Sequence, residues 1–356
     1  MSYTNGLDDP SAYFQTNLHS GDGGTGQTLT FDGNSDLQLD LHWGKCRSEG
    51  GREWQVIDTV RGITKGLTTV TAAAEYTDST YVTAIGSNGY SIGQNNDNNK
   101  AGETYVSYNW KAGGSTSTNT DGNLDTTVSV NATAGFSIVK YVGEQSATQT
   151  FGHGLNAVPK MILLKKLDNA TADWVVYHEA ITSANRLKLN TTDASASSPN
   201  WRATPTSSVF NSNSSNIINN SGDSYIAYVF AEKQGYSKIG SYTGNGNADG
   251  TFVYTGFKVG WVMHKRTDST NNWIIQDNKR VGYNANNPIL KANTSDAEQA
   301  VHEMDFVSNG FKIRTTGAGS NASGGTYIYM AFAENPFVTS TGVCATARWL
   351  CSYLLT

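Results

Sequence analysis

One strand-like phrase occurs three times along this chain, and the repetition limits the folds that the sequence can adopt. The copies read "TYVSYNWKA" from Thr104, "SYIAYVFAE" from Ser224 and "TYIYMAFAE" from Thr326. A phrase that recurs at a fixed period indicates that one structural unit was copied within the chain. The sequence therefore predicts three tandem repeats of about 100 residues each.

Landmarks around the phrase recur in the same order. The aligned positions are Lys45, Lys165 and Lys265, then Trp54, Trp174 and Trp273. Repeat units of about 20 to 50 residues cannot fold alone, but a unit of this greater length is sufficient for a sandwich of two sheets. We therefore expect three self-contained domains.

The composition favours strands over helices. Only 15% of the residues are charged, and there are 37 glycines and 18 tyrosines. Few segments place apolar residues at the helical spacing i, i+3, i+4, and the third copy contains seven short strand patterns separated by turns. The predicted fold class is all-β, with each repeat an antiparallel β-sandwich of the jelly-roll or concanavalin-like kind.

The spacing between copies predicts the domain boundaries. The first junction is longer than the second because it contains a tract rich in Ser, Thr, Gly and Asn, which is typical of a linker. The predicted units are a first sandwich with an N-terminal arm (1–114), a Ser/Thr-rich linker (115–134), a second sandwich (135–235), a third sandwich (236–337) and a C-terminal tail (338–356).

The repeated strand has two distinct faces, because side chains alternate along a strand. In the third copy one face is bulky (Ile328, Met330, Phe332), and the other carries Ala331 and Ala333 between tyrosines. We expect the bulky face to form the interior of each sandwich. We expect the face with small residues to permit close approach of a neighbouring element or domain.

Charge and targeting signals exclude several classes of partner. The net charge is -5 and the 25 Lys and Arg residues are scattered, so nucleic acid is not an expected partner. The chain starts without a signal-peptide pattern, and no stretch approaches the roughly 20 apolar residues of a membrane helix.

Three cysteines (Cys46, Cys344, Cys351) are expected to be reduced thiols, although Cys344 and Cys351 could pair in an oxidising setting.

Sequence patterns that resemble ligand motifs are interpreted as turns. "GDGGTG" (Gly21 to Gly26) satisfies G-x-G-x-x-G, but no helix pattern follows it. "DGNSD" at Asp32 and "DGNLD" at Asp121 resemble half of a calcium loop, but both lack the later Gly and Glu. We predict hairpin turns at these positions.

The titratable residues do not form a recognisable catalytic set. Six histidines never occur at a metal-ligand spacing; they are His19, His42, His153, His178, His264 and His302. His178 occupies the aligned position held by Asp58 and Asp277, which argues against a shared catalytic role. Asp58 with Arg61 and Asp277 with Arg280 form a D-x-x-R pattern, interpreted as a surface ion pair, with a glycosidase acid as the alternative.

Other candidate residues also have a structural interpretation. Trp201 lies in an insertion of the second copy, where packing is favoured over ligand binding. Asn131, Asn190 and Asn293 start N-x-S/T triplets that are expected to be ordinary turns. The sequence thus predicts no catalytic residue, no metal site and no cofactor, and it leaves ligand-binding residues unassigned.

Several phrases carry a family resemblance. They are "NGLDDPSAYFQT", "DGNSDLQLDLHW", "GHGLNAVPKMILLKK", "GSYTGNGNADGTFVYTGFKVGWVMHKRTD" and the closing "GGTYIYMAFAENPF". Between Asn5 and Phe337 the chain resembles repeat-bearing structural proteins of marine tailed bacteriophages, described as tail-fibre or virion proteins with a domain of unknown function. The resemblance implies a virion component and supplies no catalytic residue.

The resulting functional prediction is a non-enzymatic virion protein that presents a rigid surface. It would be a tail fibre, a head decoration or a head fibre, assembled in the host cytoplasm with other virion proteins. A host cell-surface glycan is a further candidate partner. A homotrimer is the first choice, although three copies in one chain could mimic a trimer alone. The alternative is a carbohydrate-binding or polysaccharide-cleaving module.

The C-terminal tail departs from the family pattern. It ends in the apolar residues Trp349, Leu350, Tyr353, Leu354 and Leu355. Because an exposed apolar terminus favours aggregation, we expect this segment to dock on its own domain or on a neighbouring subunit.

Overall fold

The computed structural model describes residues 4, 6–168, 172–198, 200–281, 284–285 and 288–344. Within these ranges the protein is all-β and consists of antiparallel sheets, as the composition predicted. The helices are single turns, namely η1 (Pro10–Ala12), α1 (Asn96–Asn99), η2 (Glu179–Ile181) and α2 (Ala318–Asn321). In the part of the chain that is described, no helix has the length and apolarity to cross a membrane.

The first third of the chain forms a large and a small sheet. The large sheet has the order β1 (Phe14–Ser20), β9 (Thr104–Trp110), β3 (Leu41–Cys46), β4 (Gln55–Asp58), β5 (Lys65–Leu67), β6 (Tyr76–Thr77). The small sheet has the order β2 (Gln27–Thr30), β8 (Gly89–Ile92), β7 (Val82–Gly86).

The middle of the chain forms an eight-stranded and a two-stranded sheet. The order in the first is β10 (Ser117–Asn119), β11 (Thr126–Asn131), β12 (Phe136–Val142), β19 (Ser224–Phe230), β14 (Met161–Lys166), β15 (Val175–His178), β16 (Asn185–Lys188), β17 (Ala196–Ser197). The second pairs β13 (Gln149–Gly152) with β18 (Val209–Ser212).

The last third again forms a six-stranded and a three-stranded sheet. The large sheet has the order β20 (Ser237–Thr243), β28 (Thr326–Pro336), β22 (Phe257–Arg266), β23 (Ile274–Asp277), β24 (Pro288–Lys291), β25 (Gln299–Ala300). The small sheet has the order β21 (Phe252–Tyr254), β27 (Gly310–Ile313), β26 (Met304–Val307).

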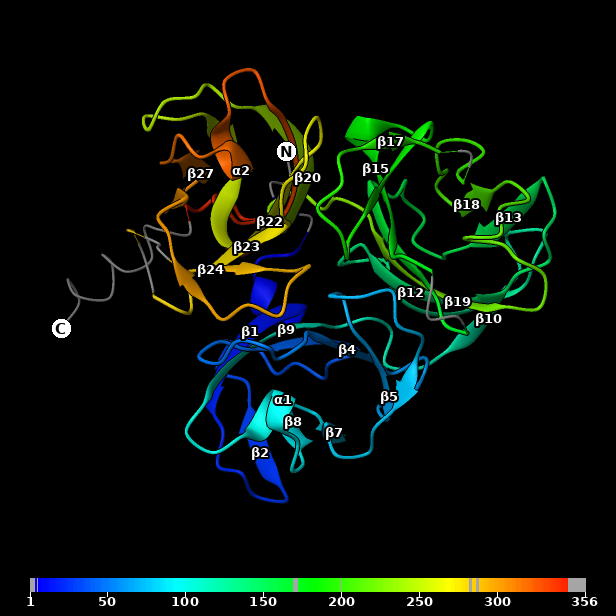
Figure 1. The fold of residues 1–356 in the computed structure, drawn as a ribbon, viewed down its shortest axis with the longest axis horizontal. Helices are drawn as coiled ribbons and strands as arrows, with labels where there is room; N and C mark the ends of the chain where they lie inside the picture. The colour runs from blue at the N-terminus through cyan, green and yellow to red at the C-terminus, as the bar shows by residue number, and fades with distance from the viewer. Residues whose placement is uncertain are drawn as a thin grey trace.

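The same strand order recurs in the three large sheets. β1, β12 and β20 pair with β9, β19 and β28. These strands then pair with β3, β14 and β22, which carry the aligned lysines. We refer to the three stretches as segment 1 (14–110), segment 2 (136–230) and segment 3 (237–336). Figure 1 shows them around a common centre, in blue to cyan, green, and yellow to red.

The stretch predicted to be a linker, 115–134, is not free of structure. β10 and β11 extend the sheet of segment 2 beyond β12, with Val128 opposite Val139. Val128 is buried in the core of segment 2. A few alternating Val and Thr residues are sufficient for a strand when a sheet edge is available to pair with them, which composition alone does not reveal.

The bulky faces of the repeated strand do not form three separate interiors, so this expectation is wrong. Residues of all three segments share one central apolar core. Trp110, Phe230 and Phe332 occupy the same position in β9, β19 and β28, and their rings meet with centroids 6.3, 5.7 and 6.2 Å apart. The bulky face of each large sheet therefore packs against the other two large sheets.

The opposite face of each large sheet forms a core that belongs to its own segment. In segment 3, Tyr329 and Ala331 pack with Phe311 and Ile313 of the small sheet. Segments 1 and 2 contain corresponding clusters. Small residues on this face do accommodate a neighbouring element, but that element is the small sheet of the same segment.

The tyrosine at the second position of each repeated strand fixes a turn. The hydroxyl oxygens of Tyr105, Tyr225 and Tyr327 accept the backbone N–H of Lys100, Asn220 and Ala322 at 2.8, 2.8 and 2.7 Å. Beside this turn, a Cβ on Gly21, Gly143 or Gly244 would lie 2.2 to 2.3 Å from a backbone oxygen. Only glycine fits there, which explains the aligned glycine of all three copies.

The aligned tryptophans connect the segments in a ring. Trp54 of segment 1 donates its indole N–H to Lys291 O of segment 3, Trp174 of segment 2 donates to Thr68 O of segment 1, and Trp273 of segment 3 donates to Lys188 O of segment 2. Each distance is 2.8 Å. The three equivalent contacts thus link segment 1 to segment 3, segment 3 to segment 2 and segment 2 to segment 1.

The aligned lysines repeat this pattern. Lys45 Nζ donates to Ser295 O, Lys165 Nζ to Ala72 O and Lys265 Nζ to Thr192 O, each time in the neighbouring segment. Burial lowers the pKa of each of these lysines to about 8. We call the three contact zones between segments the 1–2, 2–3 and 3–1 seams.

Candidate functional site

The D-x-x-R pattern of segment 1 lies at the 1–2 seam. Arg61 Nε is 2.5 Å from Asp58 Oδ2, and both side chains are no more than 1% exposed. The hydroxyl of Tyr228, from segment 2, donates to the same carboxylate oxygen at 2.8 Å, and Arg61 also pairs with Glu75 at 3.2 Å. Burial opposes the charge of Arg61, but Asp58 prevails and raises the pKa of the guanidinium.

The 3–1 seam contains a second copy of this cluster. Arg280 Nε is 2.5 Å from Asp277 Oδ2, Tyr108 of segment 1 donates to that oxygen at 2.9 Å, and Arg280 contacts Glu298 at 3.0 Å. The interpretation of both patterns as surface ion pairs is therefore wrong. Each pair is buried because the neighbouring segment covers it and supplies the tyrosine.

The 2–3 seam replaces every member of the cluster. The positions aligned with Asp, Arg, Glu and Tyr hold His178, Ile181, Ser195 and Met330. His178 Nδ1 accepts the Ala180 N–H at 3.1 Å, and its Nε2 lies 3.4 Å from Tyr329 O. Burial lowers the pKa of His178 to about 4. Because all four residues change together, no member of this cluster is left as a buried charge without its partner.

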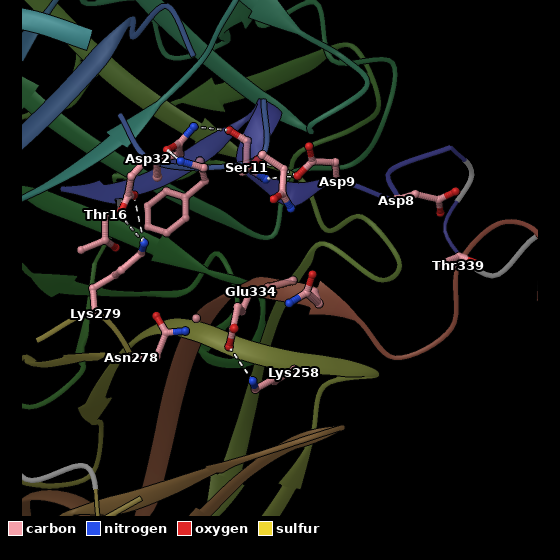
Figure 2. A pocket seen from close by; sticks show the side chains of 17 residues that line it. Asp8, Asp9, Ser11, Thr16, Asp32, Lys258, Asn278, Lys279, Glu334 and Thr339 are labelled. Atoms are coloured by element: carbon pink, nitrogen blue, oxygen red, sulfur yellow. Dashed lines mark hydrogen bonds and ion pairs between the residues drawn. The ribbon is translucent and has the colours of Figure 1, made fainter. Parts of the chain in front are cut away.

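A groove opens at the outer end of the 3–1 seam, where the two ends of the described chain meet. Its volume is about 1040 Å³, and Figure 2 shows the side chains around it. Segment 1 and the arm before it contribute one wall, and β22, β28 and the turn after β23 contribute the other. The charged side chains that line it are Asp8, Asp9, Asp32, Lys258, Lys279 and Glu334.

Opposite charges in this groove are paired. Lys258 Nζ lies 3.1 Å from Glu334 Oε2, and Lys279 Nζ lies 2.9 Å from Asp32 Oδ1 (Figure 2). The pairing of β22 with β28 shifts register around Val259, and such bulges redirect side chains. Because Lys279 and Asp32 are exposed and exposed pairs contribute little stability, these two groups can exchange partners, and the groove is suited to hydrogen bonding with a polar ligand.

Two carboxylates at the end of the groove fix the arm before β1, Asp8 to the segment after β28 and Asp9 to the loop after β2. Asp8 accepts the backbone N–H of Ser340 at 2.7 Å and also the Ser340 hydroxyl. Asp9 accepts the hydroxyls of Ser11 and Ser35 at 2.6 Å each. The arm before β1 and the strand end after β28 are thereby fixed to each other.

The six histidines lie at separate positions. Five have local partners in buried or half-buried surroundings, as His42 does with Asn109 at 2.9 Å and His264 with Ser320 at 2.8 Å. His302 contacts Asp305 at 2.9 Å. Among the residues that the structure describes, no group of three His, Cys, Asp or Glu side chains could hold a metal ion.

The remaining candidates have structural positions. Gly21 to Gly26 form a turn that leads into β2, and Asp121 lies in a turn where it receives a hydrogen bond from Asn119 at 2.9 Å. Trp201 is buried against Tyr177 and Phe210. Cys46 is buried and Cys344 exposed, each unpaired in the described part of the chain.

The asparagines of the N-x-S/T triplets cap local backbone. Asn190 Oδ1 accepts the Trp174 N–H and Asn293 Oδ1 accepts the Trp273 N–H, both at 2.9 Å. Asn131 Oδ1 accepts the Ala134 N–H at 3.0 Å. Cys351 and the apolar residues of the tail, from Trp349 onward, lie outside the described residues.

The sequence did not reveal which residues contact each other across the seams. Tyr108 and Tyr228 align with Met330 on the bulky face of the repeated strand, but the alignment does not relate them to the buried carboxylates that they contact. A usable signal exists, because the aligned Asp is replaced in the second copy (His178) and the aligned Tyr in the third (Met330), so both replacements fall at the same seam. The aligned Glu changes in the same copy as the Asp, to Ser195.

Sheets and seams together define an all-β protein of antiparallel sheets whose segments meet in one centre. The chain belongs to the family described as domain of unknown function DUF7483, whose model matches residues 9–336. This one match covers all three segments. No curated protein and no solved structure matches the chain.

Proposed function

We propose, first, that the segments are tandem repeats of one β-sandwich. In each repeat a large sheet and a small sheet enclose a core, and the other face of the large sheet contributes to the common centre. The recurring strand order and the ring formed by Trp54, Trp174 and Trp273 support this proposal. The sandwiches would span 1–114, 135–235 and 236–337.

We propose further that the protein is a non-enzymatic structural component of a bacteriophage virion, either a tail fibre, a head decoration or a head fibre. The resemblance of several phrases to those of phage structural proteins supports the assignment to a virion. The observation that carries the structural role is the closed ring of seams, in which each segment donates to the next through equivalent tryptophans. This arrangement holds the outer surfaces in fixed relative positions, which suits assembly and attachment.

The closed ring also bears on the oligomeric state. Our prediction for a fibre protein is a homotrimer. The closed ring within one chain is an observation that supports the alternative, in which three copies in one chain take the place of a trimer. Native mass spectrometry distinguishes the two. A mass of three chains supports the homotrimer, and a mass of one chain supports the internal mimic.

The position of the chain in an intact particle tests the proposed function. Mass spectrometry of purified particles should detect the protein, and cryo-electron microscopy should place it on the tail or on the head. Its absence from particles made in a host that expresses the gene would contradict the proposal.

The groove supports a second candidate, a carbohydrate-binding or polysaccharide-cleaving module. Four carboxylates, Asp8, Asp9, Asp32 and Glu334, line one polar groove, and glycoside cleavage requires two. Incubation of the protein with host polysaccharide measures turnover. Turnover that is lost in Glu334→Gln but retained in the control Asp121→Asn would replace the structural proposal, whereas we expect none.

A further inference from the structure

Two aromatic side chains are exposed on the outer face of the small sheet of segment 3. Phe252 is 46% and Tyr254 60% exposed. Both belong to β21, which forms the edge of its sheet, and Val253 between them points into the core of segment 3. Because residues two apart share a face of a strand, the two rings form one apolar row.

The other segments show that the fold does not require these aromatics. The register places Leu29, Phe151 and Val253 opposite Tyr90, Phe210 and Phe311. The positions that flank them are Thr28 and Thr30 in segment 1, Thr150 and Gly152 in segment 2, and Phe252 and Tyr254 in segment 3. Large apolar side chains at this exposed position occur in one copy only, which points to a function of that face.

Charged side chains with balanced signs lie beside the aromatic row. Lys312 is directly opposite Phe252, and Asp305 is directly opposite Lys312, so all three share the outer face. Lys312 Nζ is 2.6 Å from Asp249, and Arg314 Nε is 2.5 Å from Asp305. Two cations and two anions leave the face without net charge while supplying both donors and acceptors.

This combination matches the chemistry of a neutral saccharide. A pyranose ring offers an apolar C–H face and an edge of hydroxyls, so it can stack on Phe or Tyr while its hydroxyls bond to carboxylates and cations. A partner protein would cover roughly 800 Å², far more than two rings provide. The absence of net charge on the face favours an uncharged sugar over an acidic one.

We propose that the face formed by Phe252, Tyr254, Lys312, Asp249 and Arg314 binds a neutral oligosaccharide. The inference rests on the proposed function, which it deepens by naming the surface that would contact a host glycan. Phe252 and Tyr254 stack on sugar rings, and the charged residues bond to hydroxyls and thereby determine which sugar is accepted.

Titration of the full-length protein with defined saccharides tests this inference. The probes are cellohexaose, maltohexaose, mannohexaose and chitohexaose, with a hyaluronan hexasaccharide as the acidic comparison, measured by isothermal titration calorimetry. We expect at least one neutral probe to bind saturably, and the double variant Phe252→Thr/Tyr254→Thr to weaken that binding at least tenfold. Segment 1 already has Thr at both positions, so the variant should fold.

Three controls make the result specific. Thr28→Ala/Thr30→Ala alters the equivalent face of segment 1 and should leave the affinity unchanged. Tyr254→Trp keeps a stacking ring and should retain binding within about threefold, whereas Tyr254→Ala should lose it. Thermal unfolding followed by circular dichroism verifies that each variant folds.

Several outcomes would overturn the inference. They are no binding of any neutral probe, binding that survives the double variant, tighter binding of hyaluronan, and self-association that depends on Phe252 and Tyr254. The particle experiment remains independent: a chain present in virions that binds no saccharide would end this inference and leave the virion assignment intact.

Discussion

The hydroxyl of Tyr228 in segment 2 donates a hydrogen bond to the buried carboxylate of Asp58 in segment 1, with 2.8 Å between the oxygens. Tyr108 and Asp277 form the same contact at 2.9 Å across the 3–1 seam. Each carboxylate thus depends on a neighbouring segment for one of its donors. The three segments are therefore joined by buried polar contacts as well as by aromatic packing.

Removing this donor should weaken the 1–2 seam. Tyr228→Phe keeps the ring but leaves Asp58 one hydrogen bond short, and we expect a loss of about 1 to 3 kcal/mol in the free energy of unfolding. Urea unfolding followed by fluorescence measures it. Tyr254→Phe, which removes an exposed hydroxyl, should change the value by less than about 0.5 kcal/mol. Equal effects of the two variants would contradict the role of the seam.

The shared core predicts that the protein unfolds as one unit. Trp110, Phe230 and Phe332 lie in a single cluster with residues of all segments, so loss of one segment exposes the apolar face of the others. Differential scanning calorimetry should show one transition. Residues 236–337 expressed alone should aggregate or lack a dispersed NMR spectrum. Three separate transitions, or a folded isolated segment, would show that the segments are independent.

Exchange of the 2–3 seam residues tests whether the four positions act together. His178→Asp alone would bury a carboxylate without partners, and we expect a loss of about 3 to 5 kcal/mol. The quadruple variant His178→Asp/Ile181→Arg/Ser195→Glu/Met330→Tyr installs the set found at the other seams and should recover at least half of that loss. The triple variant that retains Met330 is the control and should recover less.

The cluster interpretation would be contradicted if the single variant were tolerated. It would also be contradicted if the quadruple variant were no more stable than His178→Asp. Both results are read from urea unfolding midpoints at neutral pH.

Buried neutral histidines should make the protein sensitive to mild acid. Burial lowers the pKa of His42 and His178 to about 4 and that of His264 to about 3, from 6.5. Below pH 6.5 the unfolded chain binds protons that the folded chain does not, so this stability is fully present above pH 6.5 and declines towards pH 4. Each histidine contributes a slope of at most about 1.4 kcal/mol per pH unit.

Urea unfolding at pH 7, 6 and 5 measures this decline, and His264→Gln should reduce its slope. NMR of the imidazole rings should show that His178 and His264 remain neutral at pH 5 in the folded protein. A flat stability profile over this range, or rings that titrate near pH 6.5, would contradict the prediction.

Part of the architecture could be predicted from the sequence because it depends on local alternation and repetition. The low charge and the strand-like patterns identified the all-β class, and the aligned tryptophans marked positions that form equivalent contacts in the structure. Alternation does not reveal what covers a face, however. The bulky face of Met330 and Phe332 was therefore assigned to a separate interior, although it packs in the common core. The strands within 115–134 were missed because their pairing partner, β12, supplies the stability.

The candidate site was less predictable for the same reason. The groove is assembled from residues near both ends of the chain, such as Asp9 and Glu334, and nothing in their local sequence relates them. The D-x-x-R pairs were visible, but their burial depends on Tyr108 and Tyr228, which lie in other segments. Only the replacement of the aligned Asp in the second copy together with that of the aligned Tyr in the third could have indicated the contact.

The hydrogen bonds of Asp8 to Ser340 have a consequence for how molecules could interlock. They close the 3–1 seam without any peptide bond, whereas the chain itself runs across the other two seams. If segment 1 of one molecule took the place of its counterpart on segment 3 of another, every contact of that seam would be made again between the two molecules. A high protein concentration would then favour dimers and longer oligomers in which the molecules are linked by exchanged segments. These oligomers require no contact surface beyond the existing 3–1 seam.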